Sequence, residues 1–289
     1  MWVMDFDNTL KTPILVLGAT SLIGGHLMAR LADEGFDPVA ISRRPPGGDA
    51  CWVDADLTDP DAEARLPPAA TVFSLSPIWL LPALLPGLKA RGMVRLIAFS
   101  STSRFTKVDS PEPGERAVAK ALTDAEQAIE TWCAANGVAW TILRPTLIYD
   151  EGHDENVSRI ARLVRRFHVM PLSGRGEGLR QPVHAADLAV GALAAAKAST
   201  ARNQAYDLVG GETLTYRAMV DRIFEGLCKT PRSLPMPTWL FALLMRLAKP
   251  FYPGATAAMG TRMGQDLTFD SSDATRDFGW SPRAFHPRF

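Results

Sequence analysis

Short apolar runs alternate with longer amphipathic stretches along the chain from Pro13 onward. The short runs are rich in β-branched residues and are bounded by polar or glycine positions, which is typical of buried strands. The longer stretches repeat apolar residues at helical spacing, and one of them stops at Asn136-Gly137, a common helix end. This alternation predicts a parallel sheet with helices packed on its faces. The predicted strands are Ile14–Leu17, Pro38–Ile41, Cys51–Val53, Thr71–Leu75, Val94–Phe99 and Trp140–Leu143, and the predicted helices are Leu22–Glu34, Ile78–Ala90 and Glu115–Ala135.

The pattern changes after Arg144-Pro145. We therefore expect an α/β fold in which a doubly wound parallel sheet carries a smaller C-terminal substrate lobe. The later elements are a basic helix at about 156–167, a glycine-rich loop at Ser173–Gly178, a helix at about 187–198 and a region punctuated by prolines. The predicted boundaries are 11–150 for the sheet domain, about 180–210 for its completion, and 151–180 with 211–289 for the smaller lobe.

Composition bounds the class of ligand. The 289 residues are 47% apolar, enough to bury one large core or a core with a smaller lobe. Because 31 Lys and Arg balance 31 Asp and Glu, there is no global field to hold nucleic acid or an anionic membrane. A small-molecule substrate fits better, and we expect no nucleic-acid partner.

The cysteines and the N-terminus indicate the compartment. Cys51, Cys133 and Cys228 are odd in number and far apart, which argues against a disulfide framework and against a structural zinc site. Residues 1–11 contain acids and lack a long apolar run, so we expect neither a secretory signal nor an anchor there. We predict a cytoplasmic protein that uses no metal.

A glycine-rich turn separates the first predicted strand from the first predicted helix. It reads Gly18-Ala19-Thr20-Ser21-Leu22-Ile23-Gly24-Gly25. Glycines at such a turn let the backbone approach a pyrophosphate, which then lies on the free N–H groups of the helix N-terminus. A turn without a ligand is the alternative, but the position between strand and helix favours a dinucleotide site.

This turn resembles the G-x-x-G-x-x-G loop of extended and atypical short-chain dehydrogenases/reductases, the NAD(P)-dependent epimerase/dehydratase-like family. Ser21 occupies the middle glycine's position, where it is small enough for the turn and its hydroxyl could face a phosphate. The segment Gly279-Trp280-Ser281-Pro282 resembles the epimerase ending, which extends the resemblance over nearly the whole chain. The resemblance implies a Rossmann fold and an NAD(P) cofactor. Its implied loop contacts are Gly18, Thr20, Ser21, Leu22, Ile23 and Gly24.

The end of the second strand bears on the choice of cofactor. It reads Ser42-Arg43-Arg44, where a carboxylate would normally hold the ribose of NAD. An arginine here can pair with the 2′-phosphate of NADP. We therefore expect contacts from these three residues and predict NADP as the cofactor, with NAD as the alternative. A solvated arginine pair is the other interpretation.

Further cofactor contacts follow from the resemblance. Asp54-Ala55-Asp56-Leu57 is similar to the family's D-x-D-L segment, which implies that Asp56 and Leu57 meet the adenine. Helix capping by Thr58 or Asp59 is the alternative role of this segment. The remaining implied contacts are Leu75, Ser76, Ser100 and Pro145.

The family's catalytic hydroxyl has a counterpart in this chain. In the family, a Ser or Thr at the end of the fifth strand orients the substrate oxygen, a Tyr moves the proton, and a Lys four residues later lowers the pKa of the Tyr. The fifth strand is followed by Ser100-Ser101-Thr102-Ser103. Thr102, or Ser101 one place earlier, would take the hydroxyl role.

The Y-x-x-x-K motif is absent from the next helix. If Lys120 is the family lysine, the Tyr position holds Arg116. If instead Glu126 sets the alignment of this helix with the family's motif, the Tyr and Lys positions hold Val118 and Leu122. Neither register supplies a phenol, and a solvated helix charge is the alternative interpretation of Lys120.

Two other residues could move a proton. Tyr149 lies in a segment similar to the one that borders nicotinamide and substrate in the family, where a pocket-wall role is the alternative. His184 matches a segment on the substrate side, and a structural histidine is the alternative. We interpret Asp187 as the cap of the following helix.

Two hypotheses of function remain open. One is an NAD(P)-dependent oxidoreductase or epimerase-like enzyme acting on a small-molecule carbonyl, an alcohol or a sugar-nucleotide without the usual Tyr–Lys pair. The other is a non-catalytic dinucleotide-binding regulatory or sensor protein.

Two segments suggest further contacts. The arginines of the basic helix suit a diphosphate or form a solvated face, and the stretch 234–253 is apolar yet too short to cross a bilayer. A buried lid or packing element is the preferred interpretation of that stretch. A homodimer surface and an interfacial membrane helix are the alternatives. The four arginines are Arg159, Arg162, Arg165 and Arg166.

Overall fold

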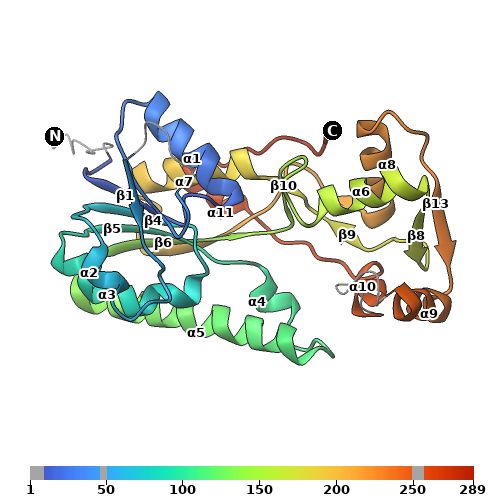
Figure 1. The fold of residues 1–289 in the computed structure, drawn as a ribbon, viewed down its shortest axis with the longest axis horizontal. Helices are drawn as coiled ribbons and strands as arrows, with labels where there is room; N and C mark the ends of the chain where they lie inside the picture. The colour runs from blue at the N-terminus through green and yellow to red at the C-terminus, as the bar shows by residue number, and fades with distance from the viewer. Residues whose placement is uncertain (1–9, 46–50, 249–256) are drawn as a thin grey trace.

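The computed structural model describes residues 10–45, 51–248 and 257–289. Its centre is a seven-stranded parallel sheet in the order β3-β2-β1-β4-β5-β6-β11 (Figure 1). The strand order reverses between β1 and β4, which confirms the doubly wound sheet predicted from the sequence. The strands are β1 (Ile14–Leu17), β2 (Val39–Ser42), β3 (Cys51–Asp54), β4 (Thr71–Ser74), β5 (Arg95–Phe99), β6 (Ala139–Pro145) and β11 (Gln204–Leu208).

Helices cover both faces of the sheet (Figure 1). One face carries α1 (Leu22–Asp33), α7 (Ala185–Lys197) and α11 (Ser272–Phe278), and the other carries α3 (Leu81–Ala90) and α5 (Pro113–Asn136). Each face buries its own apolar cluster, because the strands are apolar on both sides. Short turns of helix connect these elements at η1 (Ile78–Leu80), α2 (Ala62–Arg65) and α4 (Ser103–Thr106).

A smaller C-terminal region lies beyond the carboxyl ends of the sheet strands, on the right of Figure 1. It has a third apolar cluster, which includes Phe224, Phe241 and Phe285. Its helices are α6 (Val157–Phe167), α8 (Tyr216–Gly226), α9 (Thr238–Ala248) and α10 (Ala257–Arg262). Its two-stranded sheets pair β8 (Met170–Ser173) with β13 (Ser233–Met236), β9 (Leu179–Arg180) with β12 (Leu214–Thr215), and β7 (Ile148–Tyr149) with β10 (Val183–His184).

The C-terminal turn is anchored on the sheet's helical layer. Gly279 ends α11 in the left-handed conformation, with φ of 73°, and the Trp280 indole N–H donates to the carbonyl of Val209 at 3.1 Å. The ring fills the space above Gly191, where an added Cβ would lie 2.5 Å from it. The G-W-x-P segment therefore packs the end of the chain against α7.

Most predicted elements lie within two residues of the observed ones. The predicted helix at 78–90 begins as a 3₁₀ turn, and β11 completes the sheet inside the predicted interval 180–210. The exact domain boundaries stay a prediction. None of the described helices is long and apolar enough to span a membrane, and the final part of the apolar stretch, 249–253, lies outside the described residues.

Candidate dinucleotide site

The turn between β1 and α1 is held against the end of β4. Gly18 has φ of 73°, and a Cβ at this position would lie 2.8 Å from the backbone nitrogen of Ser76. At Gly24 an added Cβ would lie 2.3 Å from the carbonyl oxygen of Ala19. Both glycines are therefore required by the path of the backbone, as the predicted phosphate loop needs.

The start of α1 leaves backbone donors available. Among the described residues, the amides of Leu22 and Ile23 have no hydrogen-bond partner, as expected for the first turn of a helix. Ser21 caps the helix, and its hydroxyl oxygen accepts from the amide of Gly24 at 3.2 Å. That hydroxyl keeps its own hydrogen for an outside acceptor. These groups fit a pyrophosphate at the positive end of the helix dipole.

Hydroxyls and arginines follow β2. The hydroxyls of Thr20 and Ser42 lie 3.1 Å apart, and Ser42 also accepts from the amide of Arg44 at 3.2 Å. Arg43 and Arg44 are exposed, so their guanidinium groups can reach a ligand in solvent. The described residues that end this strand, Ser42 to Arg44, include no carboxylate, and the choice of NADP over NAD stays a prediction.

Asp56 lies beyond the end of β3. One of its carboxylate oxygens accepts from the backbone N–H and the hydroxyl of Thr58, at 2.9 and 2.7 Å. These hydrogen bonds lower the pKa of the exposed Asp56 carboxyl, with a smaller contribution from the charge of Arg43. Asp56 therefore stays ionised with a second oxygen free for a ligand, while it also shapes the turn.

The ends of β4 and β6 lie in the middle of the carboxyl edge of the sheet. The Leu75 amide donates to Leu17 at 2.8 Å, and the hydroxyls of Ser74 and Ser76 lie 3.3 Å apart. The carbonyl of Pro145 accepts from both the amide and the hydroxyl of Thr102, at 3.2 and 3.1 Å. Because all strands are parallel, these residues share the edge with the glycine turn.

Beside this edge, the buried carboxylate of Glu126 binds two arginines and a serine hydroxyl. Its side chain is 1% exposed and binds Ser100 and Arg104, and its Oε2 accepts from Nε and Nη2 of Arg144 at 2.9 and 2.6 Å. Arg144 also faces Asp207, whose pKa is raised by burial and by the nearby Glu126 charge, against the opposing effect of Arg144. The Ser100 hydroxyl is thus turned toward α5, and its cofactor contact stays a prediction.

The predicted catalytic hydroxyls both have structural partners. Thr102 is buried and donates to Pro145, and the Ser101 hydroxyl accepts from the amide of Ser103 at 3.1 Å. Lys120 lies on the exposed face of α5, where its ammonium pairs with Asp124. This arrangement favours the interpretation of Lys120 as a solvated helix charge over the catalytic one.

His184 and Tyr149 lie together where the sheet meets the smaller region. Tyr149 is 1% exposed and packs edge-to-face against His184, with ring centroids 5.0 Å apart. Burial raises the pKa of the Tyr149 hydroxyl, with a further contribution from the charge of Glu151. The geometry therefore favours a pocket-wall role for Tyr149.

His184 caps α7, which corrects the sequence interpretation of Asp187. The Ala186 amide donates to Nδ1 of His184 at 3.0 Å, so His184 takes the position expected of Asp187. Asp187 lies in the first turn and binds the guanidinium of Arg283, with its Oδ1 2.9 Å from Nε. A histidine acceptor at the cap is less common than an aspartate, and this made Asp187 the more obvious choice.

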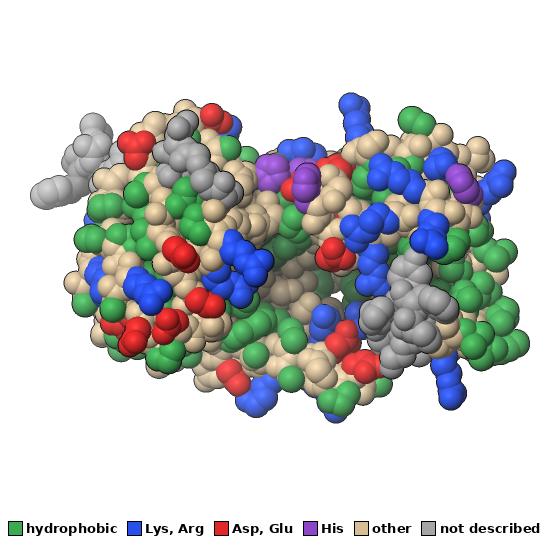
Figure 2. All heavy atoms as spheres, in the orientation of Figure 1, with side chains coloured by type: hydrophobic (Ala, Val, Ile, Leu, Met, Phe, Trp, Pro, Cys, Tyr) green, Lys and Arg blue, Asp and Glu red, His purple; other side chains and the backbone are tan. Residues whose placement is uncertain are grey.

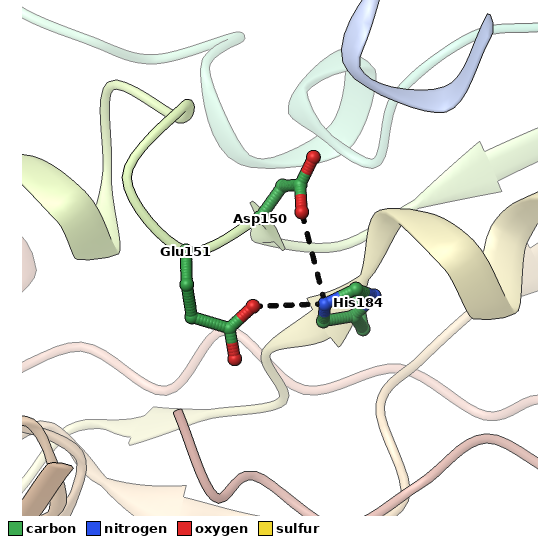
Figure 3. Close-up of side chains that lie close together, drawn as sticks. All are labelled: Asp150, Glu151 and His184. Carbon is green, nitrogen blue, oxygen red and sulfur yellow. Dashed lines mark hydrogen bonds and ion pairs between the residues drawn. The ribbon is translucent and has the colours of Figure 1, made fainter. Parts of the chain in front are cut away.

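Figure 3 shows two carboxylates beside His184, a cluster that the sequence analysis missed. Nε2 of His184 lies 3.0 Å from Oε2 of Glu151 and 3.8 Å from Oδ1 of Asp150, and Oδ2 of Asp150 lies 3.2 Å from Nε2 of His26. The adjacent acids that follow β7 were the available signal, but nothing in the sequence pairs them with His26 or His184.

The protonation of His184 decides what this cluster can bind. Ligand atoms of Asp150, Glu151 and His184 lie within 4.8 Å of one another, close enough for one metal ion. Because Nδ1 accepts from Ala186, the neutral ring carries its hydrogen on Nε2, which donates to Glu151. A metal on Nε2 would force that hydrogen onto Nδ1, against the Ala186 amide. The cluster therefore suits a fixed hydrogen-bond donor better than a metal ligand.

A hollow lies between the sheet and the smaller region in the space-filling view (Figure 2). Arg262 of α10 and Glu115 of α5 form an ion pair that links the two parts. The Glu115 carboxylate also accepts from the Ser110 hydroxyl at 2.6 Å.

Comparison with known proteins agrees with this geometry. A family model described as NAD(P)H-binding matches residues 18–168. A UDP-glucose 4-epimerase from Vibrio cholerae is 24% identical over 163 residues, covering 55% of this chain and 47% of its own, so the chain spans about half the length of this relative.

Two solved structures share the fold. A UDP-glucose 4-epimerase with UDP-glucose from Thermotoga maritima has a TM-score of 0.71 at 18% identity, covering 94% of each chain. A short-chain dehydrogenase/reductase superfamily protein from Agrobacterium tumefaciens with bound NAD has a TM-score of 0.71 at 14% identity, covering 94% of this chain and 93% of its own. The predicted Rossmann fold and its resemblance to short-chain dehydrogenases/reductases are confirmed. With its phosphate-loop geometry and a family model matched over more than half its length, the chain belongs to the NAD(P)H-binding family.

Proposed function

We propose that the chain binds NADP(H) along the carboxyl edge of its sheet, with the diphosphate on the amides of Leu22 and Ile23. The observation that carries this proposal is the pair of amide donors at the start of α1, beside the left-handed Gly18, which have no partner within the described part of the chain. The exposed Arg43 and Arg44 then lie at the strand end that faces the adenosine ribose in this fold. They would hold the 2′-phosphate, which NAD(H) lacks.

The position of Glu126 supports one register for the missing catalytic motif. Glu126 is buried against Ser100 and Arg144 at the ends of β5 and β6, whereas Lys120 faces solvent. We therefore align the family's Tyr and Lys with Val118 and Leu122, two turns and one turn before Glu126. Neither side chain can move a proton, so the usual relay has no counterpart in this register.

We further propose that the ligand beside the cofactor is a small carbonyl or alcohol, including the sugar of a sugar-nucleotide. The hollow supports this class of ligand, and so does the similarity of the chain to two UDP-glucose 4-epimerases. A bound nicotinamide supplies hydride chemistry, while the protein binds and orients the substrate. Proton transfer would have to come from solvent or from a group of the substrate.

A second candidate is a dinucleotide-binding regulatory protein without turnover. Val118 and Leu122 favour it, because apolar residues at the relay positions remove the general acid and the cation that tunes it. Both candidates share the same binding site and differ only in chemistry.

Two measurements separate these candidates. Titration of the full chain with NADPH and NADH, followed by nucleotide fluorescence, should show saturable binding with NADPH favoured. Absence of binding by either nucleotide would overturn the proposal.

Turnover is then measured with UDP-sugars and simple ketones, in the wild type and in the Val118→Tyr/Leu122→Lys variant. Activity of the wild type identifies an enzyme with an atypical proton path. Activity only in the double variant identifies a binding protein and confirms the register. A double variant that binds NADPH and is inactive, beside an inactive wild type, would contradict the proposed register.

A further inference from the structure

Helix α9 exposes apolar side chains on its outer surface. Trp239 is 70% exposed, Leu243 47% and Leu247 65%, and these residues follow one another at intervals of four. Leu240 and Leu244, also exposed, widen the same stripe. On the opposite side, Phe241 is 2% exposed and packs into the third apolar cluster. The helix is therefore anchored by one apolar face and presents a second one outward.

The stripe continues onto the neighbouring strand. Leu234 of β13 is 53% exposed, and β13 pairs with β8, which α9 contacts. Figure 2 shows hydrophobic side chains gathered at this end of the molecule, over β13 and α9. Single exposed leucines need no explanation, but a contiguous group of this kind marks a contact surface.

The charges of the segment that carries the stripe are of one sign, although the Ser233 hydroxyl of β13 donates to Asp221 of α8 at 2.8 Å. Between Glu225 and Asp266 the sequence has no acidic residue, while it has Arg232 and Arg246, both exposed. The basic helix α6 belongs to the same region and packs on β8; its Arg165 and Arg166 are exposed, and its exposed Arg162 pairs with Glu155. The overall charge balance hides this local excess of cations.

We propose that α9 is an interfacial helix that docks the smaller region on an anionic phospholipid surface. Its 11 residues give a length of about 16 Å, which is too short to cross a bilayer and suits a helix lying in the headgroup layer. Trp239 is a residue type that prefers this interface, and the arginines match anionic headgroups.

A second copy of this chain fits the surface less well. A symmetric contact through α9 would bring Arg232 and Arg246 of both copies together, with no acid in this segment to pair with them. Like charges at a buried interface oppose association. Lipid headgroups supply the missing negative charge.

The test is flotation of the full chain with vesicles of phosphatidylcholine alone and of phosphatidylcholine with about one-third phosphatidylglycerol. We expect binding to the anionic vesicles that weakens as salt rises. The variant Leu243→Ser/Leu247→Ser should lose at least about tenfold in partition coefficient, because it removes two inserted side chains. The Arg246→Gln variant should weaken binding to anionic vesicles and leave binding to neutral ones unchanged.

The matched control is Val108→Ser/Val190→Ser, which removes two comparably exposed apolar residues elsewhere, at 53% and 48% exposure. It should bind vesicles like the wild type. NADPH affinity and circular dichroism verify that each variant is folded.

Wild-type protein that stays away from both vesicle types would overturn the proposal, as would equal losses in the test and control variants. Light scattering tests the other possible occupant of this surface, a second copy of the chain. A dimer in vesicle-free buffer that Leu243→Ser/Leu247→Ser dissociates would assign the surface to a second copy.

Discussion

Glu126 of α5 and Arg144 at the end of β6 form a bidentate contact, with Nε and Nη2 of Arg144 2.9 and 2.6 Å from one carboxylate oxygen. The pair joins the helix that would carry the family's catalytic motif to the strand end beside it. Because Glu126 is 1% exposed, these partners compensate the burial of its carboxylate.

Replacing Glu126 with Gln should destabilise the fold by about 3 kcal/mol, since the half-buried Arg104 would lose its carboxylate and Arg144 would keep only Asp207. Urea unfolding followed by circular dichroism measures the change. Glu130→Gln, one turn later on α5, is the control and should change stability by about 0.5 kcal/mol or less. Equal effects in the two variants would contradict the role given to the pair.

Replacing Arg43 with Ala should raise the Kd for NADPH about tenfold or more and leave the Kd for NADH nearly unchanged, because only NADPH has the 2′-phosphate. Fluorescence titration with both nucleotides gives the two constants. Arg65→Ala, at an exposed arginine on α2, is the control. A parallel loss of affinity for both nucleotides would assign Arg43 to another part of the cofactor.

Gly18→Ala should abolish nucleotide binding, since φ of 73° and a contact of 2.8 Å to the Ser76 nitrogen leave no room for a Cβ. The matched change is Gly25→Ala, where an added Cβ meets nothing within 4 Å. In a helix, that change should stabilise the protein by about 0.5–1 kcal/mol. NADPH titration of both variants measures the loss of binding, and thermal unfolding measures the change in stability. Normal binding by Gly18→Ala would refute the proposed turn.

The Glu115 contact with Arg262 should make stability depend on pH. Burial raises the pKa of this carboxyl, but the Ser110 hydrogen bond and the charges of Arg262 and Lys107 outweigh it, so the folded pKa lies below the ordinary value of 4.5. The contribution to stability is then complete above 4.5 and is lost as the pH falls through the folded pKa.

Urea midpoints of the wild type and Glu115→Gln should therefore differ at pH 7 and converge as the pH falls through the folded pKa of Glu115, which lies below 4.5. Comparing the two proteins across pH cancels the titration of other carboxyls. A difference that does not change with pH would show that Glu115 acts through packing alone.

Cys133 should resist thiol reagents in the folded protein. Burial raises the pKa of its thiol to about 12, so the reactive thiolate is absent near neutral pH. The exposed Cys51 and Cys228 should react promptly, and the third thiol only in denaturant. Counting labelled thiols by mass spectrometry checks this, and fast labelling of Cys133 without denaturant would contradict its burial.

The sheet and the glycine turn were predictable because their signals are local. β1 and the start of α1 match their predicted bounds, since an apolar run and a left-handed glycine need only neighbouring residues to be recognised. The sequence also indicated that the Tyr–Lys motif is missing, but the register stayed open. The contacts of buried Glu126 with Ser100 and Arg144, both distant in sequence, and the exposed position of Lys120 favour one of the two alignments.

The short strands and the contacts of the histidines could be recognised only in the folded structure. Strands such as β7 and β10 have two residues each, too short for a hydrophobic period to be visible. His26 of α1 meets Asp150, which follows β7, because β7 pairs with β10 and the next element, α7, packs against α1, a relationship that no local pattern encodes. His184 was expected near the substrate, whereas its use as a helix cap depends on which ring nitrogen faces Ala186.

Strand β11 has a consequence for how the protein is made. A ribosome must translate the whole interval 146–203 before this strand can cover the open edge of β6. Until then the nascent chain presents a bare strand edge, the kind of surface on which unrelated chains aggregate. Late completion of the sheet makes synthesis of this protein sensitive to chaperones and to premature termination in that interval.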